Sequence, residues 1–307
     1  MADSVLHQNL TSAERIHPQD RIRSLVFKMA IATLLLMAIG SATRVMNAGL
    51  ACPDWPLCYG TLIPTQQMNL QVFLEWFHRL DASLIGLMAI ALVGLSWWYR
   101  QELPKWLPWA ALVALSLIVF QGILGGLTVT ELLRFDIVTA HLGAALLFFS
   151  TLIVIGTLLL PYQGTGAVDK LPWIGLSAAI LVYLQSLLGA LVASKWALHQ
   201  CLAGAQLCGV MHSHIAGVVP PTLATVVLTV LALRTPALHP LLRKLAHYAG
   251  ALVLLQIILG VATFWLHLQV EPLTVAHQAV GASLLGVLVA FTVLGWRELK
   301  APIPTLR

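Results

Sequence analysis

Residues 75–98 read EWFHRLDASLIGLMAIALVGLSWW, and in this stretch one histidine, His78, stands at the start of a long apolar run. The same arrangement recurs three times, at His141, His214 and His277. His78 and His214 are separated by 136 residues, and so are His141 and His277. A fixed separation of this kind is typical of an internal duplication. The chain is therefore expected to contain two copies of one four-helix unit.

The composition excludes an ordinary water-soluble domain. Of the 307 residues, 59% are hydrophobic and 9% are charged, and the mean hydropathy is +0.88. A helix needs roughly 20 apolar residues to cross a bilayer. We therefore predict an all-α polytopic membrane protein whose eight transmembrane helices form two parallel four-helix-bundle repeats. The predicted spans are 25–46, 79–98, 107–129, 138–160, 172–193, 212–233, 245–266 and 276–296.

The duplication divides the chain into five predicted parts. These are an N-terminal tail (1–24), an N-terminal bundle (25–160), a linker (161–171), a C-terminal bundle (172–297) and a C-terminal tail (298–307). The polar first 24 residues contain no apolar core behind a basic segment, so no cleaved signal peptide is expected.

The distribution of Lys and Arg predicts the orientation. Thirteen of these 17 residues fall on the side that holds both termini, and four fall on the other side, namely Arg44, Arg79, Arg134 and Lys195. Because cytoplasmic loops carry the excess of Lys and Arg, both termini are predicted to be cytoplasmic. The formal net charge of +5 then requires no nucleic-acid partner, since membrane lipid accounts for it.

All four cysteines fall in predicted external loops, in close pairs at equivalent places in the two repeats. This arrangement predicts two local disulfides, Cys52–Cys58 and Cys201–Cys208. Four free thiols packed as small apolar side chains are the alternative. A thiol oxidoreductase is less well supported, because such enzymes usually carry Cys-x-x-Cys and these pairs are more widely spaced.

The four histidines are expected at similar depth, about one turn inside the outer face, because the even-numbered spans all run inward. His78 would then face His141, and His214 would face His277. Zinc and copper sites use three or four ligands, whereas porphyrin iron needs two axial ligands, so two haem sites are predicted. His212 lies two residues from His214, and only the repeat spacing chooses between them. Interfacial histidines are the competing interpretation.

Three odd-numbered spans share the pattern Gln-x-x-Leu-Gly, beginning at Gln121, Gln185 and Gln256. The glycine lets a flat ligand or another helix approach closely. The amide needs a hydrogen-bonding partner inside the membrane, and helix packing alone does not provide a reason for it.

The outer-side cations and one carboxylate distinguish the two repeats. Arg44, Arg79, Arg134 and Lys195 lie where outward-pointing haem propionates would be bound. Glu75 and Arg79 flank His78, but the residues 136 positions later are apolar, Met211 and Ile215. We therefore expect chemistry in the N-terminal pocket and a permanently bound, electron-transferring haem in the C-terminal pocket.

Together, the duplicated eight-helix pattern, the four histidines, the motif Glu75-x-x-His78-Arg79 and the external cysteine pairs resemble the CtaA/Cox15 family of haem A synthases. The resemblance covers residues 25–297. It implies an oxidoreductase of the bacterial cytoplasmic (inner) membrane that oxidises the C8 methyl group of haem O to the formyl group of haem A by successive hydroxylations. The product serves haem-copper terminal oxidases.

The resemblance also implies roles for individual residues. His78 and His141 would flank the substrate haem O, and His214 and His277 would ligate haem B. Glu75 would be the catalytic acidic residue near the reacting site, where it could deliver protons or stabilise a cationic intermediate at the methyl carbon. The implied partners are a haem O synthase and terminal oxidase subunits. The electron donor is unknown, since no flavin or nicotinamide fingerprint is present, and a homo-oligomer stays open because lipid-facing and partner-facing surfaces have similar composition.

Two other classes of protein share part of this pattern. A diheme cytochrome b-like, quinol-linked electron carrier would use the same four histidines but leaves Glu75 and the asymmetry of the repeats without a role. A transporter built from parallel repeats would explain the duplication alone.

Overall fold

A computed structural model describes residues 17–166, 168–193, 208–266 and 270–300. Apart from an isolated bridge between Cys58 and Thr61, its regular structure is helical. Eight helices in these ranges are long and apolar enough to cross a membrane, which confirms the predicted fold class. The elements are α2 (Pro18–Val45), α3 (Leu70–Trp98), α4 (Leu107–Thr130), α5 (Phe135–Leu158), α6 (Leu171–Ala193), α8 (Cys208–Ala216), α9 (Val219–Arg234), α10 (Pro240–Trp265) and α11 (Glu271–Leu299).

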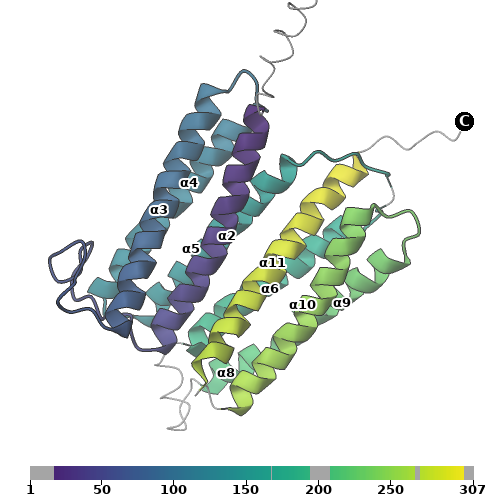
Figure 1. The fold of residues 1–307 in the computed structure, drawn as a ribbon. Helices are drawn as coiled ribbons and strands as arrows, with labels where there is room; N and C mark the ends of the chain where they lie inside the picture. Colours follow the sequence, from purple (N-terminus) through teal and green to yellow (C-terminus); the bar gives the residue numbers. More distant parts are fainter. Residues whose placement is uncertain (1–16, 167, 194–207, 267–269, 301–307) are drawn as a thin grey trace, which may run out of the picture.

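The eight spans lie in two groups side by side (Figure 1), with α2 to α5 in one bundle and α6 to α11 in the other. Helix α11 packs against α2 and α5, and α5 packs against α6, so these helices join the bundles. The start of α2 and the end of α11 lie at the same end of the molecule. Phe291 and Leu288 of α11 are fully buried in the shared core.

Several helices begin before the apolar stretches that predict them. Helix α3 starts at Leu70 because the Asn69 side chain accepts hydrogen bonds from the backbone N–H groups of Gln71 and Val72, both at 3.0 Å. Gln71, Glu75 and His78 interrupt the apolar residues of this first part, so the predicted span does not include it. His78 consequently lies about two turns after the start of α3, and its depth below the outer membrane face stays a prediction.

The sixth span, expected as one helix, is interrupted after Ala216. Pro220 and Pro221 open α9 and lack the N–H groups that would continue the preceding helix. Gly217 caps α8 through a 2.7 Å bond from its N–H to the Ser213 carbonyl. A Cβ atom at Gly217 would lie 2.6 Å from the Gln185 amide oxygen, so the close approach requires glycine.

The segment between the bundles is fastened to the end of α11. Glu298 is fully buried and accepts hydrogen bonds from the Tyr162 hydroxyl at 2.5 Å and from the Thr165 and Gly166 N–H groups. Arg297 lies over the Tyr162 ring and donates to two carbonyl oxygens at the end of the α5 segment. Burial, together with the Glu298 hydrogen bond, raises the pKa of Tyr162.

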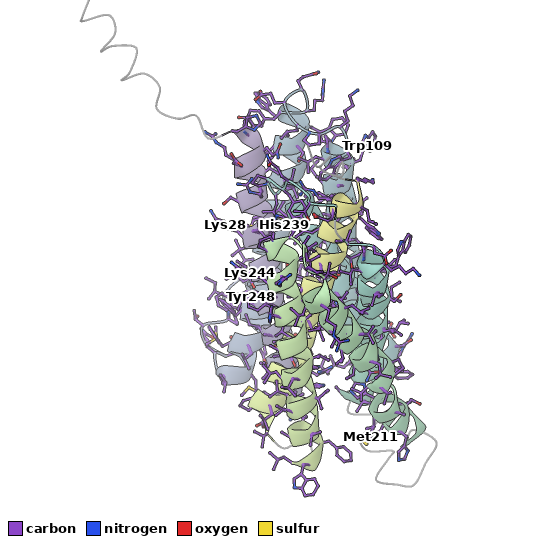
Figure 2. The ribbon with its side chains drawn as sticks, turned by 90° about the vertical axis from the view of Figure 1, so that its right-hand side faces the viewer. Lys28, Trp109, Met211, His239, Lys244 and Tyr248 are labelled. Atoms are coloured by element: carbon purple, nitrogen blue, oxygen red, sulfur yellow. A yellow bond between two sulfur atoms is a disulfide. The ribbon has the colours of Figure 1, made fainter. Side chains whose placement is uncertain are left out.

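Basic side chains mark this end of the molecule. Figure 2 shows Lys28 and His239 in its upper half, Lys244 near the middle and Met211 near the lower end. This separation agrees with the charge distribution along the chain. The cytoplasmic placement of the termini and the boundaries of the five parts stay predictions.

Candidate functional site

The first bundle encloses a cavity of about 1170 Å³, which is large for a small-molecule pocket. Its walls come from α2, α3, α4, α5 and the loop between α2 and α3. The cavity brings together seven residues that the sequence analysis selected, and these are Arg44, Glu75, His78, Arg79, Gln121, Arg134 and His141.

The imidazole rings of His78 and His141 face each other across this cavity. Their centroids are 6.5 Å apart. Two imidazoles that bind one iron at about 2 Å per bond place their ring centroids about 6 Å apart. The Nδ1 atoms of both rings are buried and have no hydrogen-bond partner among the described residues. The spacing therefore fits a bis-histidine iron site.

His214 and His277 form an equivalent pair in the second bundle, with ring centroids also 6.5 Å apart. His212, the alternative on the same helix, is exposed. The structure thus places His214, and not His212, opposite His277. Within the described ranges no three His, Cys, Asp or Glu residues form a metal-binding group, so both pairs offer axial ligands and not a zinc-type shell.

Each of the four imidazoles lies against a glycine of a neighbouring helix. A Cβ atom built at these glycines would lie 2.8–3.3 Å from the imidazole Cε1. The imidazole rings therefore fit only because glycine has no side chain at these positions. Three of the glycines end the Gln-x-x-Leu-Gly pattern, and the fourth was missed because Leu36 replaces the glutamine on α2. The four glycines are Gly40, Gly125, Gly189 and Gly260.

The side-chain amides of the three glutamines in the same pattern have the hydrogen-bonding partners that the sequence analysis required, and these partners are the histidines. The Gln121 amide nitrogen lies 3.3 Å from His141 Nε2, and that of Gln256 lies 3.3 Å from His277 Nε2. The Gln185 amide donates to the His214 carbonyl oxygen at 2.7 Å. In both halves, therefore, a glycine and a glutamine amide on an odd-numbered span lie against a histidine of a neighbouring helix.

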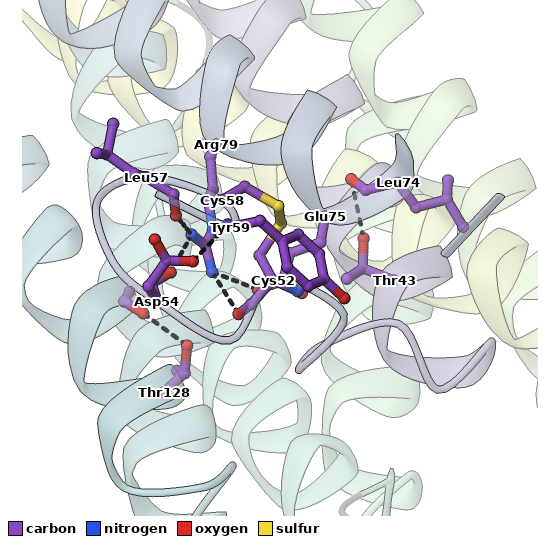
Figure 3. A network of polar contacts seen from close by, with 11 residues as sticks. Thr43, Cys52, Asp54, Leu57, Cys58, Tyr59, Leu74, Glu75, Arg79 and Thr128 are labelled. Atoms are coloured by element: carbon purple, nitrogen blue, oxygen red, sulfur yellow. Dashed lines mark hydrogen bonds and ion pairs between the residues drawn. A yellow bond between two sulfur atoms is a disulfide. The ribbon is translucent and has the colours of Figure 1, made fainter. Parts of the chain in front are cut away.

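Glu75 and Arg79 form an ion pair that holds the external loop (Figure 3). Glu75 is 4% exposed; its Oε1 pairs with Arg79 at 2.6 Å and its Oε2 accepts from the Cys52 N–H at 2.8 Å. Arg79 also donates to the carbonyl oxygens of Asp54, Leu57 and Cys52. Its guanidinium is therefore occupied by the loop and is not free for a propionate.

The loop forms a compact cover over the cavity. The predicted Cys52–Cys58 disulfide is present. Hydrogen bonds from the Gly60 and Tyr59 N–H groups to the Asp54 carboxylate lower the pKa of Asp54. The Trp55 ring packs on Gly126 of α4, where a Cβ atom would approach it within 3.2 Å.

The second predicted disulfide, Cys201–Cys208, lies outside the described residues because Cys201 and the side chain of Cys208 are not among them. Lys195 also lies outside the described residues.

The remaining two cations differ in the partners they already have. Arg134 is exposed and pairs with Asp136 at 2.8 Å and Glu131 at 3.3 Å; the hydrogen bonds that its guanidinium donates to the Asp136 carboxylate raise the pKa of Arg134. Arg44 has no carboxylate partner among the described residues, and its buried Nε lacks a hydrogen bond there. Within the described part of the chain, its guanidinium donates to the Gln278 side chain, a residue that the sequence analysis did not select. Arg44 is thus the cavity cation available to an anionic ligand group.

The chain was compared with known proteins. The family model COX15-CtaA, described as a cytochrome oxidase assembly protein, matches residues 23–289. A protein of Caulobacter vibrioides named "Heme A synthase" is 31% identical, with 89% of this chain and 94% of the relative aligned. Proteins of the same name from Shewanella oneidensis (28% identical; 87% and 94% aligned) and Halalkalibacterium halodurans (25%; 83% and 84%) are also similar. This chain belongs to the COX15-CtaA family of cytochrome oxidase assembly proteins.

Proposed function

We propose that this multi-pass membrane protein is a haem A synthase, an oxidoreductase that converts the C8 methyl group of haem O to the formyl group of haem A. The observation that carries the proposal is the presence of two facing histidine pairs, one in each bundle, each with ring centroids 6.5 Å apart. The first pair lies in a large cavity that also contains Glu75, Arg79 and Arg44. The names of the family relatives support the same activity.

In the first bundle, His78 and His141 would hold the iron of the substrate haem O from opposite sides. The Arg44 guanidinium would bind a propionate, because it lacks a carboxylate partner among the described residues. Each of two hydroxylations inserts one oxygen atom from O₂ into a C–H bond and consumes two electrons and two protons. Loss of water from the resulting diol leaves the formyl group.

Glu75 would act as a fixed negative charge beside the reacting methyl group. Both of its carboxylate oxygens are occupied by N–H donors, from Arg79 and from Cys52. Because these donors fix the carboxylate in one position, its role would be electrostatic stabilisation of positive charge on the substrate carbon. The loop that Arg79 holds would keep water out of the cavity.

In the second bundle, His214 and His277 would ligate haem B. The imidazole spacing and the glycines Gly189 and Gly260 fit such a group. The positions equivalent to Glu75 and Arg79 carry Met211 and Ile215, which provide no acid or cation. Haem B, when bound, would supply one-electron transfer, and the residues of this bundle would hold it in place.

The cellular setting follows from the reaction. A haem O synthase would supply the substrate, and subunits of a haem-copper terminal oxidase would receive the product. In a bacterium the location would be the cytoplasmic (inner) membrane, with both termini on the cytoplasmic side, as the charge distribution predicts.

The test is to express this chain together with a haem O synthase in a host that makes no haem A, and to identify the extracted haems by chromatography and mass. Haem A or its hydroxymethyl precursor is the expected product. Haem B and unconverted haem O alone, from folded protein with a haem spectrum, would contradict the proposal and favour the diheme cytochrome alternative, which needs the same two histidine pairs.

A further inference from the structure

The cavity in the first bundle extends well beyond the histidine pair. On α3 its lining continues from His78 to Ile90, twelve residues or roughly 18 Å further into the membrane at about 1.5 Å per residue. On α5 the lining continues from His141 to Phe148, roughly 10 Å further by the same rise. We call this inner part of the cavity the deep arm. A porphyrin held by the two imidazoles leaves it unfilled.

The deep arm differs in chemistry from the outer part of the cavity. The charged lining residues lie at the outer part, near the external loops, and they are Arg44, Glu75, Arg79, Glu131 and Arg134. The described residues that line the deep arm carry no charge. They include Ile85, Leu87 and Ile90 on α3, Leu115 and Val119 on α4, and Phe148 on α5. Such a surface suits a hydrocarbon chain.

The deep arm opens sideways between α3 and α4. Leu87, Ile90 and Val119 line the cavity and yet are 62%, 58% and 55% exposed. Gly86 on α3 and Gly122 on α4 line the same seam, and a Cβ atom at either position would meet no other atom within 4 Å. Because both helices span the membrane, this opening faces the hydrocarbon of the bilayer.

We propose that the deep arm binds the isoprenoid tail of haem O, and that the opening between α3 and α4 admits this tail from the bilayer. This inference rests on the proposed function. Haem O differs from haem B by a long isoprenoid chain, which is attached on the side of the porphyrin away from the propionates. With a propionate at Arg44 and the iron between His78 and His141, the tail points into the deep arm. The arm would therefore select haem O over haem B.

The test uses the purified full chain, already carrying its resident haem, to which haem O or haem B is added while absorbance reports binding of a further equivalent. Wild-type protein is expected to bind haem O at least about tenfold more tightly than haem B, because several methylene groups are buried. Gly86→Leu fills the deep arm and is expected to abolish this preference. Gly94→Leu is the matched control, since Gly94 lies on the same helix, also has open space, and does not line the cavity.

A second pair of variants covers the case in which Gly86→Leu fails to fold. Val119→Phe narrows the opening from α4, and Val113→Phe changes a similarly exposed residue of that helix (53%) that does not line the cavity. The inference is supported if Val119→Phe lowers the preference for haem O and Val113→Phe does not.

Equal binding of haem O and haem B by the wild type would overturn the inference, and so would an unchanged preference in folded Gly86→Leu or Val119→Phe. If the wild type prefers haem O but never oxidises it, the proposed function fails while the inference stands. If the wild type oxidises haem O and the variants keep its preference, the inference alone fails.

Discussion

Arg44 of α2 donates a hydrogen bond to the side-chain oxygen of Gln278 of α11 over 3.3 Å, which joins the two bundles beside the cavity. The amide nitrogen of Gln278 donates in turn to the Met37 carbonyl oxygen of α2 at 3.1 Å. Gln278 directly follows His277. The residue next to a proposed ligand of haem B therefore orients the cation proposed to bind haem O.

Replacing Gln278 should weaken the first site without emptying the second. Gln278→Leu removes both hydrogen bonds, so the Arg44 guanidinium loses its orientation. We expect haem O affinity to fall by about three- to tenfold, measured by titration, while the haem B content of the purified protein stays unchanged. In Gln278→Glu, the new carboxylate should restore the orientation of Arg44. It should also compete with a haem propionate for the Arg44 guanidinium. Loss of haem B in both variants would mean that Gln278 serves the second site instead.

The three described cations of the cavity should contribute unequally to substrate binding. Arg44→Gln should lower haem O affinity by at least about tenfold, because a buried charge-assisted hydrogen bond to a propionate is lost. Arg134→Gln should change it by less than about twofold, since Arg134 is exposed and already paired with Asp136 and Glu131. Equal effects in the two variants would show that Arg44 is not the propionate partner.

The glycines that face the imidazoles allow each site to be disturbed alone. Gly40→Ala places a methyl group 2.8 Å from His78 Cε1, and Gly189→Ala places one 3.0 Å from His214 Cε1. The first variant should lose haem O binding and keep haem B, and the second should do the reverse, as quantified from extracted haems. Gly94→Ala, with open space, is the control. If either variant loses both haems equally, the two halves are not specialised as proposed.

Glu75→Gln tests the role of charge at the reacting position. The amide keeps the size of the side chain and an oxygen that can accept from the Cys52 N–H, but it removes the negative charge. Conversion of haem O is expected to fall by about 10²-fold, with haem O affinity and haem B content retained. Glu75→Asp, which restores the charge on a shorter side chain, should recover part of the rate. Full activity in Glu75→Gln would exclude the electrostatic role.

The linker clamp should contribute to stability in a pH-dependent way. Tyr162→Phe removes the hydrogen bond to buried Glu298, a loss of about 1 kcal/mol and about 2–4 °C in Tm. The pKa of Tyr162 is raised in the folded protein. The contribution of Tyr162 to the free energy of unfolding is therefore full below pH 10, roughly the pKa of tyrosine in the unfolded chain. Above that pH the contribution declines, because the tyrosine ionises in the unfolded chain. Melting curves of the two proteins should converge above about pH 10; a constant difference would contradict this assignment.

The sequence alone determined the features that depend on composition and spacing. Hydropathy requires eight spans, because a backbone can cross a bilayer only as a long apolar helix or a closed barrel. The 136-residue repeat selected His78, His141, His214 and His277. The break after Ala216 was also readable in principle, since the pair Pro220-Pro221 cannot continue a helix.

The tertiary structure decided which polar groups meet. Arg44, Arg79 and Arg134 were equivalent candidates in the sequence, and only the path of the loop through Cys52 and Leu57 shows that Arg79 is occupied by its carbonyl groups. Local spacing places residues on a helix face but does not say which distant segment covers that face. For the same reason Gln278, 234 residues from Arg44 in the chain, could be found only when α2 and α11 were seen packed together.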